Sequence, residues 1–235
     1  MEKTLTFTLG HKVDMTFNLI SPGTFIMGDE EEFNEYGWAE KPKHEVILSK
    51  HFYLSNCQVT RQQWQYVMGY KTYEYEGEIH LPAVNMTWKE ALTFTRKMNE
   101  KFGSLLPEGY EFSLPTEAQW EFACRAGATG DFNGSGIWHK KFSGGMTHPV
   151  GMLKPNAWGL YDMQGNVWES CLDWEAGLTG GIDPRGAPVG KNRIKRGGGW
   201  TYHGSRSSLS FRGYHRAPMH AFDDLGFRLA LPLAE

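Results

Sequence analysis

Hydrophobic and polar residues alternate over much of the first 55 residues, a pattern typical of half-buried β-strands. Turns rich in glycine and proline interrupt the alternation, so each expected strand is short. The expected strands cover residues 4–9, 14–20, 24–28, 45–48 and 51–55. The acidic, turn-rich stretch 29–43 is expected to be a surface loop.

Three threonines mark the change from strand periodicity to helical periodicity. Thr60, Thr87 and Thr116 each begin a Thr-x-x-Glu/Gln capping box, in which the hydroxyl accepts a bond from a backbone N–H of the first helical turn. Apolar residues at helical spacing follow each box. We therefore predict three helices, the longest over residues 87–102.

Glycine and proline punctuate the chain beyond residue 127, where the helical pattern stops. Such a stretch can be ordered only if short strands and large side chains anchor it. The expected anchors are Trp138, Trp158, Trp168, Trp174 and Trp200. No repeat or linker divides the sequence, so residues 1–235 are expected to form a single domain.

The overall composition excludes several classes of function. A net charge of −3 and an isoelectric point near 6.3 give no electrostatic reason to expect nucleic acid as a partner. No run of about 18 apolar residues exists, so no membrane span is expected. The three cysteines lack metal-ligand spacing and favour buried thiols in a reducing compartment. The cytoplasm is thus expected, although a chain whose leader had been removed would look the same, and export stays open.

Nine segments in order resemble the formylglycine-generating-enzyme/sulfatase-modifying-factor family. They are GTFIMG (23–28), EKPKHEV (40–46), VT (59–60), PAVNMTW (82–88), LPTEAQWEFA (114–123), PVG (149–151), PNAWGLYDM (155–163), GNVWE (165–169) and the frame of RGGGW (196–200) with GFR (226–228). Each segment alone is a weak signal, whereas nine in sequence are specific. The resemblance implies an α+β, C-type lectin-like fold that is rich in loops, with short antiparallel strands and about three helices.

The family's oxidases use two cysteines shortly after the RGG-x-aromatic segment to bind copper and oxidise a substrate cysteine. Those positions fall at Tyr202 and Ser207, and neither side chain supplies a thiolate. A second catalytic branch adds a helical module with a three-histidine iron site, which this chain lacks. We therefore expect neither formylglycine generation nor a copper or iron site.

The remaining branch resembles the variable proteins of diversity-generating retroelements. In these proteins the same frame encloses a diversified segment that binds ligand, so residues 196–231 are the candidate variable region. Arg212 corresponds to a fixed arginine of that branch. The residues expected to contact ligand are Thr201, Tyr202, His203, Arg206, Phe211, Tyr214, His215, Arg216, His220 and Phe222.

The family resemblance also implies a structural calcium site. Its ligands would be backbone carbonyls of Gln164, Gly165 and Val167 together with the carboxylate of Glu169. Calcium prefers such hard oxygen ligands in an irregular loop. The alternative is that Asn166 and Glu169 hydrogen-bond backbone groups within a tight turn.

Four other polar residues have a chemical and a structural interpretation. His44 and His148 could serve as a ligand or base, but a structural histidine is the favoured interpretation. Asp162 and Asp173 could pair for acid–base chemistry, but hydrogen bonds that stabilise turns are favoured.

The leading functional hypothesis is a non-catalytic protein that binds a protein or other macromolecular ligand through residues 201–224. One alternative is an enzyme of the same superfamily with an unrecognised active site. Another is an inactive paralogue that acts as a subunit or a chaperone-like partner. The sequence leaves the ligand and the oligomeric state open.

Overall fold

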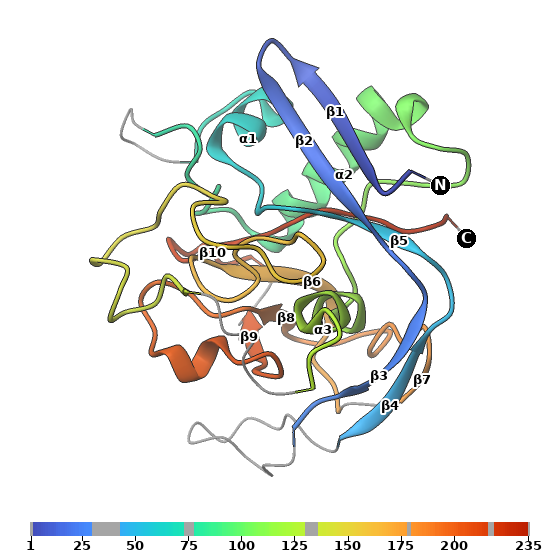
Figure 1. The fold of residues 1–235 in the computed structure, drawn as a ribbon. Helices are drawn as coiled ribbons and strands as arrows, with labels where there is room; N and C mark the ends of the chain where they lie inside the picture. The colour runs from blue at the N-terminus through green and yellow to red at the C-terminus, as the bar shows by residue number, and fades with distance from the viewer. Residues whose placement is uncertain are drawn as a thin grey trace.

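The computed structural model describes residues 2–29, 43–72, 78–129, 136–177, 180–215 and 219–234 (Figure 1). The loop expected over residues 29–43 therefore lies almost wholly outside the described residues. Helices and several small sheets combine in one chain, which confirms the α+β class.

Three helices form where the capping boxes predict them. They are α1 (Arg61–Met68), α2 (Trp88–Phe102) and α3 (Glu117–Arg125). Both halves of each capping box are present, because the threonine hydroxyl accepts the N3 backbone bond and the N3 side chain bonds back. Of two short 3₁₀ helices, η1 (Gly103–Leu105) directly follows α2, and η2 (Gly204–Ser207) lies near the C-terminal end. Within the described ranges, no helix combines the length and hydropathy that a membrane span needs.

The first and last strands of the chain belong to one sheet, with both termini beside it (Figure 1). Its order is β1 (Thr4–Gly10), β2 (Val13–Ile20), β5 (Phe52–Ser55) and β11 (Ala230–Leu231), and all pairs are antiparallel. The five strands expected before residue 56 are present, within a few residues of their predicted ends.

Two further sheets carry the rest of the strands. The second has the order β10 (Leu225–Gly226), β6 (Trp168–Trp174), β8 (Arg193–Arg196) and β9 (Gly213–His215). The third has the order β3 (Gly23–Met27), β4 (His44–Leu48) and β7 (Gly181–Ile182). Most pairs are antiparallel as expected, but β10 with β6 and β4 with β7 run parallel. These parallel partners are two-residue strands far away in sequence, which alternation cannot reveal.

Buried aromatic side chains fill the space between the helices and the sheets. Trp64 of α1 stacks on Phe94 of α2 with ring centroids 5.7 Å apart, and Phe227 packs edge-on against Phe94 at 5.3 Å. Trp120 of α3 belongs to a second core cluster, which the strands β4, β5 and β6 also line. Trp168 lies in a third, smaller cluster beneath the candidate variable region. Of the five expected tryptophan anchors, only Trp168 is fully buried.

Ion pairs between arginine and glutamate cross the interior. Glu169 of β6 is fully buried, and its Oε2 and Oε1 accept bonds from Arg228 Nε at 2.6 Å and Nη2 at 2.7 Å. Trp120 Nε1 and Gln58 Nε2 donate to the same carboxylate at 2.6 and 3.0 Å. Arg228 also donates to the carbonyl of Ser55 on β5 at 3.0 Å, so one ion pair connects two sheets.

We expect Glu169→Gln to lower the free energy of unfolding by about 3–5 kcal/mol, because Arg228 would keep a buried charge without its carboxylate. Urea denaturation measures the loss. The exposed Glu108→Gln is the matched control. In the double variant Glu169→Gln/Arg228→Met, the free energy of unfolding should fall by less than the sum of the decreases in the two single variants. A loss no larger than that of the control would contradict this account.

Candidate ligand-binding face

Two glycines of the RGGGW segment turn the chain out of the core. Gly197 and Gly198 have φ values of 94° and 75°, which disfavour any side chain. A Cβ on Gly198 would lie 2.3 Å from Ser207 Oγ, so the turn also packs too closely for one. At the other end of the segment, a Cβ on Gly226 would lie 2.6 Å from the carbonyl oxygen of Ala83. Both ends of the region are therefore fixed by close backbone packing.

Arg196 holds the segment from the core side. It is fully buried, forms an ion pair with Glu121, and donates to the carbonyls of Ser210 at 2.6 Å and Leu209 at 3.0 Å. The Arg196 side chain thus binds backbone carbonyls of the candidate variable region. These bonds do not depend on which side chains the region presents at the surface.

Arg212 is a second buried anchor. Its Nε and Nη2 contact the two oxygens of Glu117 at 2.6 and 2.7 Å, and Nη1 donates to the carbonyl of Ala176 at 2.9 Å. Burial alone would raise the pKa of Glu117, but Arg212 and Arg196 hold it below its ordinary value. These bonds give a physical reason for the fixed arginine that the resemblance implies at this position.

Six of the ten expected contact residues are half-buried or exposed, and we call them the display face. They are Thr201, Tyr202, His203, Arg206, His220 and Phe222. The guanidinium of Arg206 lies over the ring of Tyr202 at 4.6 Å from its centroid. The rings of His220 and Phe222 lie 6.3 Å apart. Thr201 Oγ1 donates to Asp224 at 3.0 Å.

The other four expected contact residues are placed differently. Phe211 is 3% exposed and packs against Trp168, with ring centroids 5.9 Å apart, so its ring supports the face from inside. The backbones of Tyr214 and His215 belong to β9, but their side chains lie outside the described part of the structure. Arg216 lies outside it altogether.

Lys195 is a cation at this face that the sequence analysis missed. Its Nζ lies 4.6 Å from the ring centroid of Trp168, 5.7 Å from that of Phe222 and 6.0 Å from that of Tyr202. Burial lowers the pKa of Lys195 to about 8, against the opposing effect of Asp224. The ammonium therefore links two display-face rings that are twenty positions apart in sequence.

Gly213 makes room for this arrangement. It pairs with Lys195 across β8 and β9, and a Cβ there would lie 2.9 Å from Lys195 Cγ and 2.8 Å from the ring of Trp168. A glycine opposite a lysine could have indicated in the sequence that Lys195 lies at this face. That pairing can be recognised only once the register of the two strands is known.

The positions of the oxidase cysteines are occupied by side chains without thiol chemistry. Tyr202 is half-buried, and Ser207 is buried with no hydrogen-bond partner for its hydroxyl among the described residues. Burial raises the pKa of Cys57 to about 12 and also raises those of Cys124 and Cys171. All three thiols are thus held in the unreactive protonated form.

Three of the four expected calcium ligands point toward one atom, the amide nitrogen of Gln58. It lies 3.0 Å from Glu169 Oε1, 3.1 Å from the carbonyl of Val167 and 3.4 Å from that of Gly165. The fourth expected ligand was the backbone carbonyl of Gln164; the side chain of this residue donates to the carbonyl of Ser207 in η2. The converging oxygens suit a hard cation, but the amide takes that position and Arg228 balances the Glu169 charge. In the described ranges, no cluster of three or more His, Cys, Asp or Glu side chains could hold a metal ion.

The neighbouring polar residues hydrogen-bond the backbone. Asn166 has a left-handed φ of 64° and exchanges bonds with the backbone of His148 at 3.0 Å in each direction. His148 Nε2 lies 2.7 Å from the carbonyl of Ser143. Asp162 accepts from the backbone N–H of Gly151 at 2.7 Å, so these residues hold loops together.

Comparison with known proteins agrees with this architecture. Residues 11–233 match the sulfatase-modifying factor enzyme 1-like domain, and the chain belongs to that family. The formylglycine-generating enzyme of Streptomyces coelicolor is 30% identical over 181 residues, which cover 66% of this chain and 54% of that enzyme. The enzyme of Bos taurus is 29% identical over 177 residues, covering 63% and 43%. The chain thus spans about half the length of these relatives.

Two solved structures extend the likeness over almost the whole chain. Treponema denticola variable protein 1 superposes with a TM-score of 0.85 at 27% identity, covering 98% of this chain and 99% of that one. PvdO from Pseudomonas aeruginosa superposes with a TM-score of 0.83 at 24% identity, covering 99% and 100%. They confirm the expected fold of the formylglycine-generating-enzyme type and the likeness to a variable protein.

Asp173 provides a test of the interior electrostatics. Burial and the nearby Glu117 raise the pKa of Asp173 to about 7, while its carboxylate accepts the backbone N–H of Glu117 at 2.6 Å. Between about pH 4 and pH 7 the folded protein keeps a proton that the unfolded chain releases, so this group's contribution to stability falls as pH rises.

We expect Asp173→Asn to remove that decline, because an amide oxygen can accept the same bond without charge. Urea unfolding of both proteins from pH 4.5 to pH 8 measures it, and the variant should gain stability relative to the parent as pH rises. The exposed Glu108→Gln should track the parent throughout. A constant difference between Asp173→Asn and the parent would show that Asp173 is not protonated in the folded state.

Proposed function

We propose that this chain is a non-catalytic ligand-binding protein and that the display face contacts a protein or another macromolecule. The observation that carries the proposal is the division between a buried frame and exposed side chains. Arg196 binds backbone carbonyls of the segment, and Arg212, itself part of the segment, binds Glu117 and the carbonyl of Ala176 in the interior. The side chains of the display face take no part in those anchors.

The composition of the display face supports binding. Aromatic side chains such as tyrosine provide large contact areas for little loss of conformational entropy, and tyrosine and arginine are both enriched among the residues that dominate binding energy. Arg206 over Tyr202 and Lys195 beneath Tyr202 and Phe222 give the surface cations held close to rings. Such an arrangement favours a ligand surface that combines acidic and apolar groups.

The likeness to Treponema denticola variable protein 1 supports a further element of the proposal. We propose that the display face is diversified between copies of the gene, as the resemblance to retroelement variable proteins implies. The frame tolerates such change because its anchors are backbone carbonyls and core carboxylates.

A second candidate function is that of an inactive paralogue that assists another protein. The relatives named chaperone protein LppX of Paenibacillus barcinonensis, 28% identical, and inactive C-alpha-formylglycine-generating enzyme 2 of Mus musculus, 31% identical, support it. Stable stoichiometric complexes that survive loss of the display-face side chains would favour this candidate over the first.

A structural calcium ion is also part of the proposal, held by the carbonyls of Gln164, Gly165 and Val167 and by Glu169. The amide of Gln58 must then turn so that its oxygen faces the ion. We expect 2 mM calcium to raise the melting temperature by about 3–8 °C over EGTA, since an ion that binds only the folded state stabilises it by mass action. Magnesium at about 2 mM is the control, because these carbonyls form no octahedral cage. Identical melting in calcium and EGTA would mean that Gln58 takes the place of the ion.

A saturation-mutagenesis library tests the division between frame and display face. We expect most substitutions at the display face to change the free energy of unfolding by less than about 1 kcal/mol. Substitutions of Arg196, Arg212 or Arg228 should lower it by about 3 kcal/mol or more. Surface display followed by protease challenge and sequencing gives the stability of each variant. Phe211 is the matched aromatic control, because its ring is buried in the same segment.

If Tyr202 and Phe222 prove as intolerant as Phe211, the segment is core and the binding proposal fails. Amplicon sequencing of the gene's 3′ end across the source population then tests diversification. Substitutions confined to codons 201–224 are the expected result. A uniform sequence would leave a binder of fixed specificity.

A further inference from the structure

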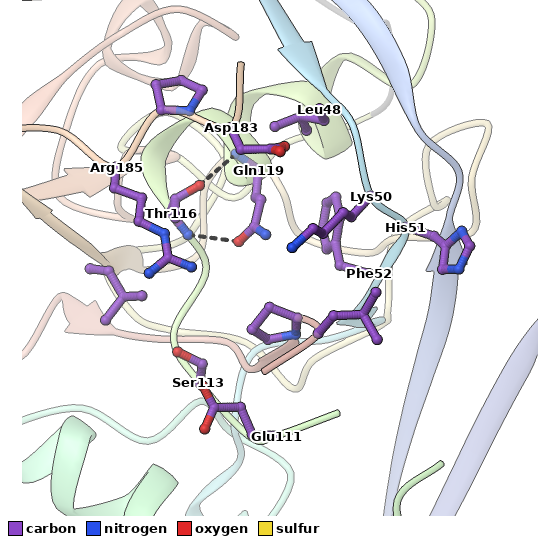
Figure 2. A pocket seen from close by; sticks show the side chains of 14 residues that line it. Leu48, Lys50, His51, Phe52, Glu111, Ser113, Thr116, Gln119, Asp183 and Arg185 are labelled. Atoms are coloured by element: carbon purple, nitrogen blue, oxygen red, sulfur yellow. Dashed lines mark hydrogen bonds between the residues drawn. The ribbon is translucent and has the colours of Figure 1, made fainter. Parts of the chain in front are cut away.

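A pocket of about 260 Å³ lies where four distant segments meet, and no residue of the display face lines it (Figure 2). The segments are residues 48–52, 111–119, 183–185 and 232–233, with Leu172 between them. Leu48 and Phe52 are almost fully buried and supply an apolar wall. We call this cavity the Lys50 pocket.

Three nitrogen-bearing side chains point into the Lys50 pocket. Figure 2 shows Lys50 and Arg185 directed toward its middle from opposite sides, with the amide of Gln119 between them. Gln119 uses its oxygen to accept the backbone N–H of Thr116 at 2.9 Å, which leaves the amide nitrogen facing the cavity. Lys50 Nζ forms no hydrogen bond or ion pair with any described residue.

Hydrogen bonds between neighbouring residues clamp together the two segments that carry these cations. Asp183 accepts from the backbone N–H of Ser49 at 2.8 Å and from the Ser49 hydroxyl. The backbone N–H of Asp183 donates to the carbonyl of Ile47 at 2.8 Å. Because Lys50 follows Ser49 and Arg185 lies two residues after Asp183, this clamp fixes the relative position of the two backbone segments from which these side chains extend. The Asp183 carboxylate oxygens face Ser49, while the other lining carboxylate, Glu111, lies at the far end beside Ser113 (Figure 2).

We propose that the Lys50 pocket binds a small carboxylic acid with an apolar body, its carboxylate between Lys50, Arg185 and the Gln119 amide. Arginine recognises a planar carboxylate through two parallel bonds, and lysine adds a point charge. Leu48, Phe52 and the neighbouring leucine and proline side chains would cover the apolar body. The volume is below the range of drug-sized ligand sites, so one ring or a short branched chain fills it.

The test is a titration of the full chain with benzoate, benzamide and benzylamine, followed by amide chemical shifts in NMR. Benzoate should shift resonances of residues that line the Lys50 pocket and bind about tenfold more tightly than benzamide, because only its anion forms charge-assisted bonds. Benzylamine should bind least. Lys50→Gln should weaken benzoate binding about tenfold and leave benzamide unchanged. Lys89→Gln, a change of an exposed lysine on α2, should affect neither.

Equal binding of benzoate and benzamide would overturn the proposal, as would the absence of benzoate binding at 20 mM, roughly the weakest affinity expected for so small an anion. Shifts centred on the display face instead of the pocket would also overturn it. The proposed function does not depend on this result, because the two sites share no residue.

Discussion

Glu169 accepts four hydrogen bonds inside the protein, and two of them come from Arg228. This carboxylate lies on β6, whereas Arg228 also bonds the carbonyl of Ser55 on β5, so the second sheet is joined to the first through one ion pair. A buried charge without its partner is far more destabilising than the pair itself. Neither member can therefore change alone, and the relative placement of the two sheets depends on both.

The same principle fixes the candidate variable region while leaving its surface independent. Arg196 and Arg212 take their charge partners from α3, and both also donate to backbone carbonyls, Arg196 to Ser210 and Leu209 and Arg212 to Ala176. A carbonyl is present whatever the side chain, so the bonds of Arg196 do not depend on the side chains of Ser210 and Leu209. The side chains that point outward can vary without loss of these bonds, and the proposal that this surface binds a ligand rests on that independence.

The parts of the structure that rest on local interactions could be predicted from the sequence. Thr60, Thr87 and Thr116 cap helices through partners three residues away, and each helix begins where its threonine predicts. Lys195 was missed because its place opposite Gly213 follows from the register of very short strands, where one residue more or less reverses the face. The packing of Phe211 on Trp168 joins segments that are distant in sequence, which local periodicity does not reveal. Gln58 was missed because the oxygens around it lie more than a hundred residues further along the chain.

The last strand has a consequence for how this protein is made. β11 pairs with β5, and the backbone of Val59 donates to Phe227 and that of Ser55 to Leu229, so the end of the chain completes the sheet begun by its first residues. A stop codon or a frameshift anywhere in the segment 201–224 would remove this strand together with Arg228. The N-terminal sheet would then lack its edge and the buried Glu169 its cation. Folding thus depends on an intact reading frame through the whole candidate variable region, and cellular proteolysis can remove truncated products that cannot fold.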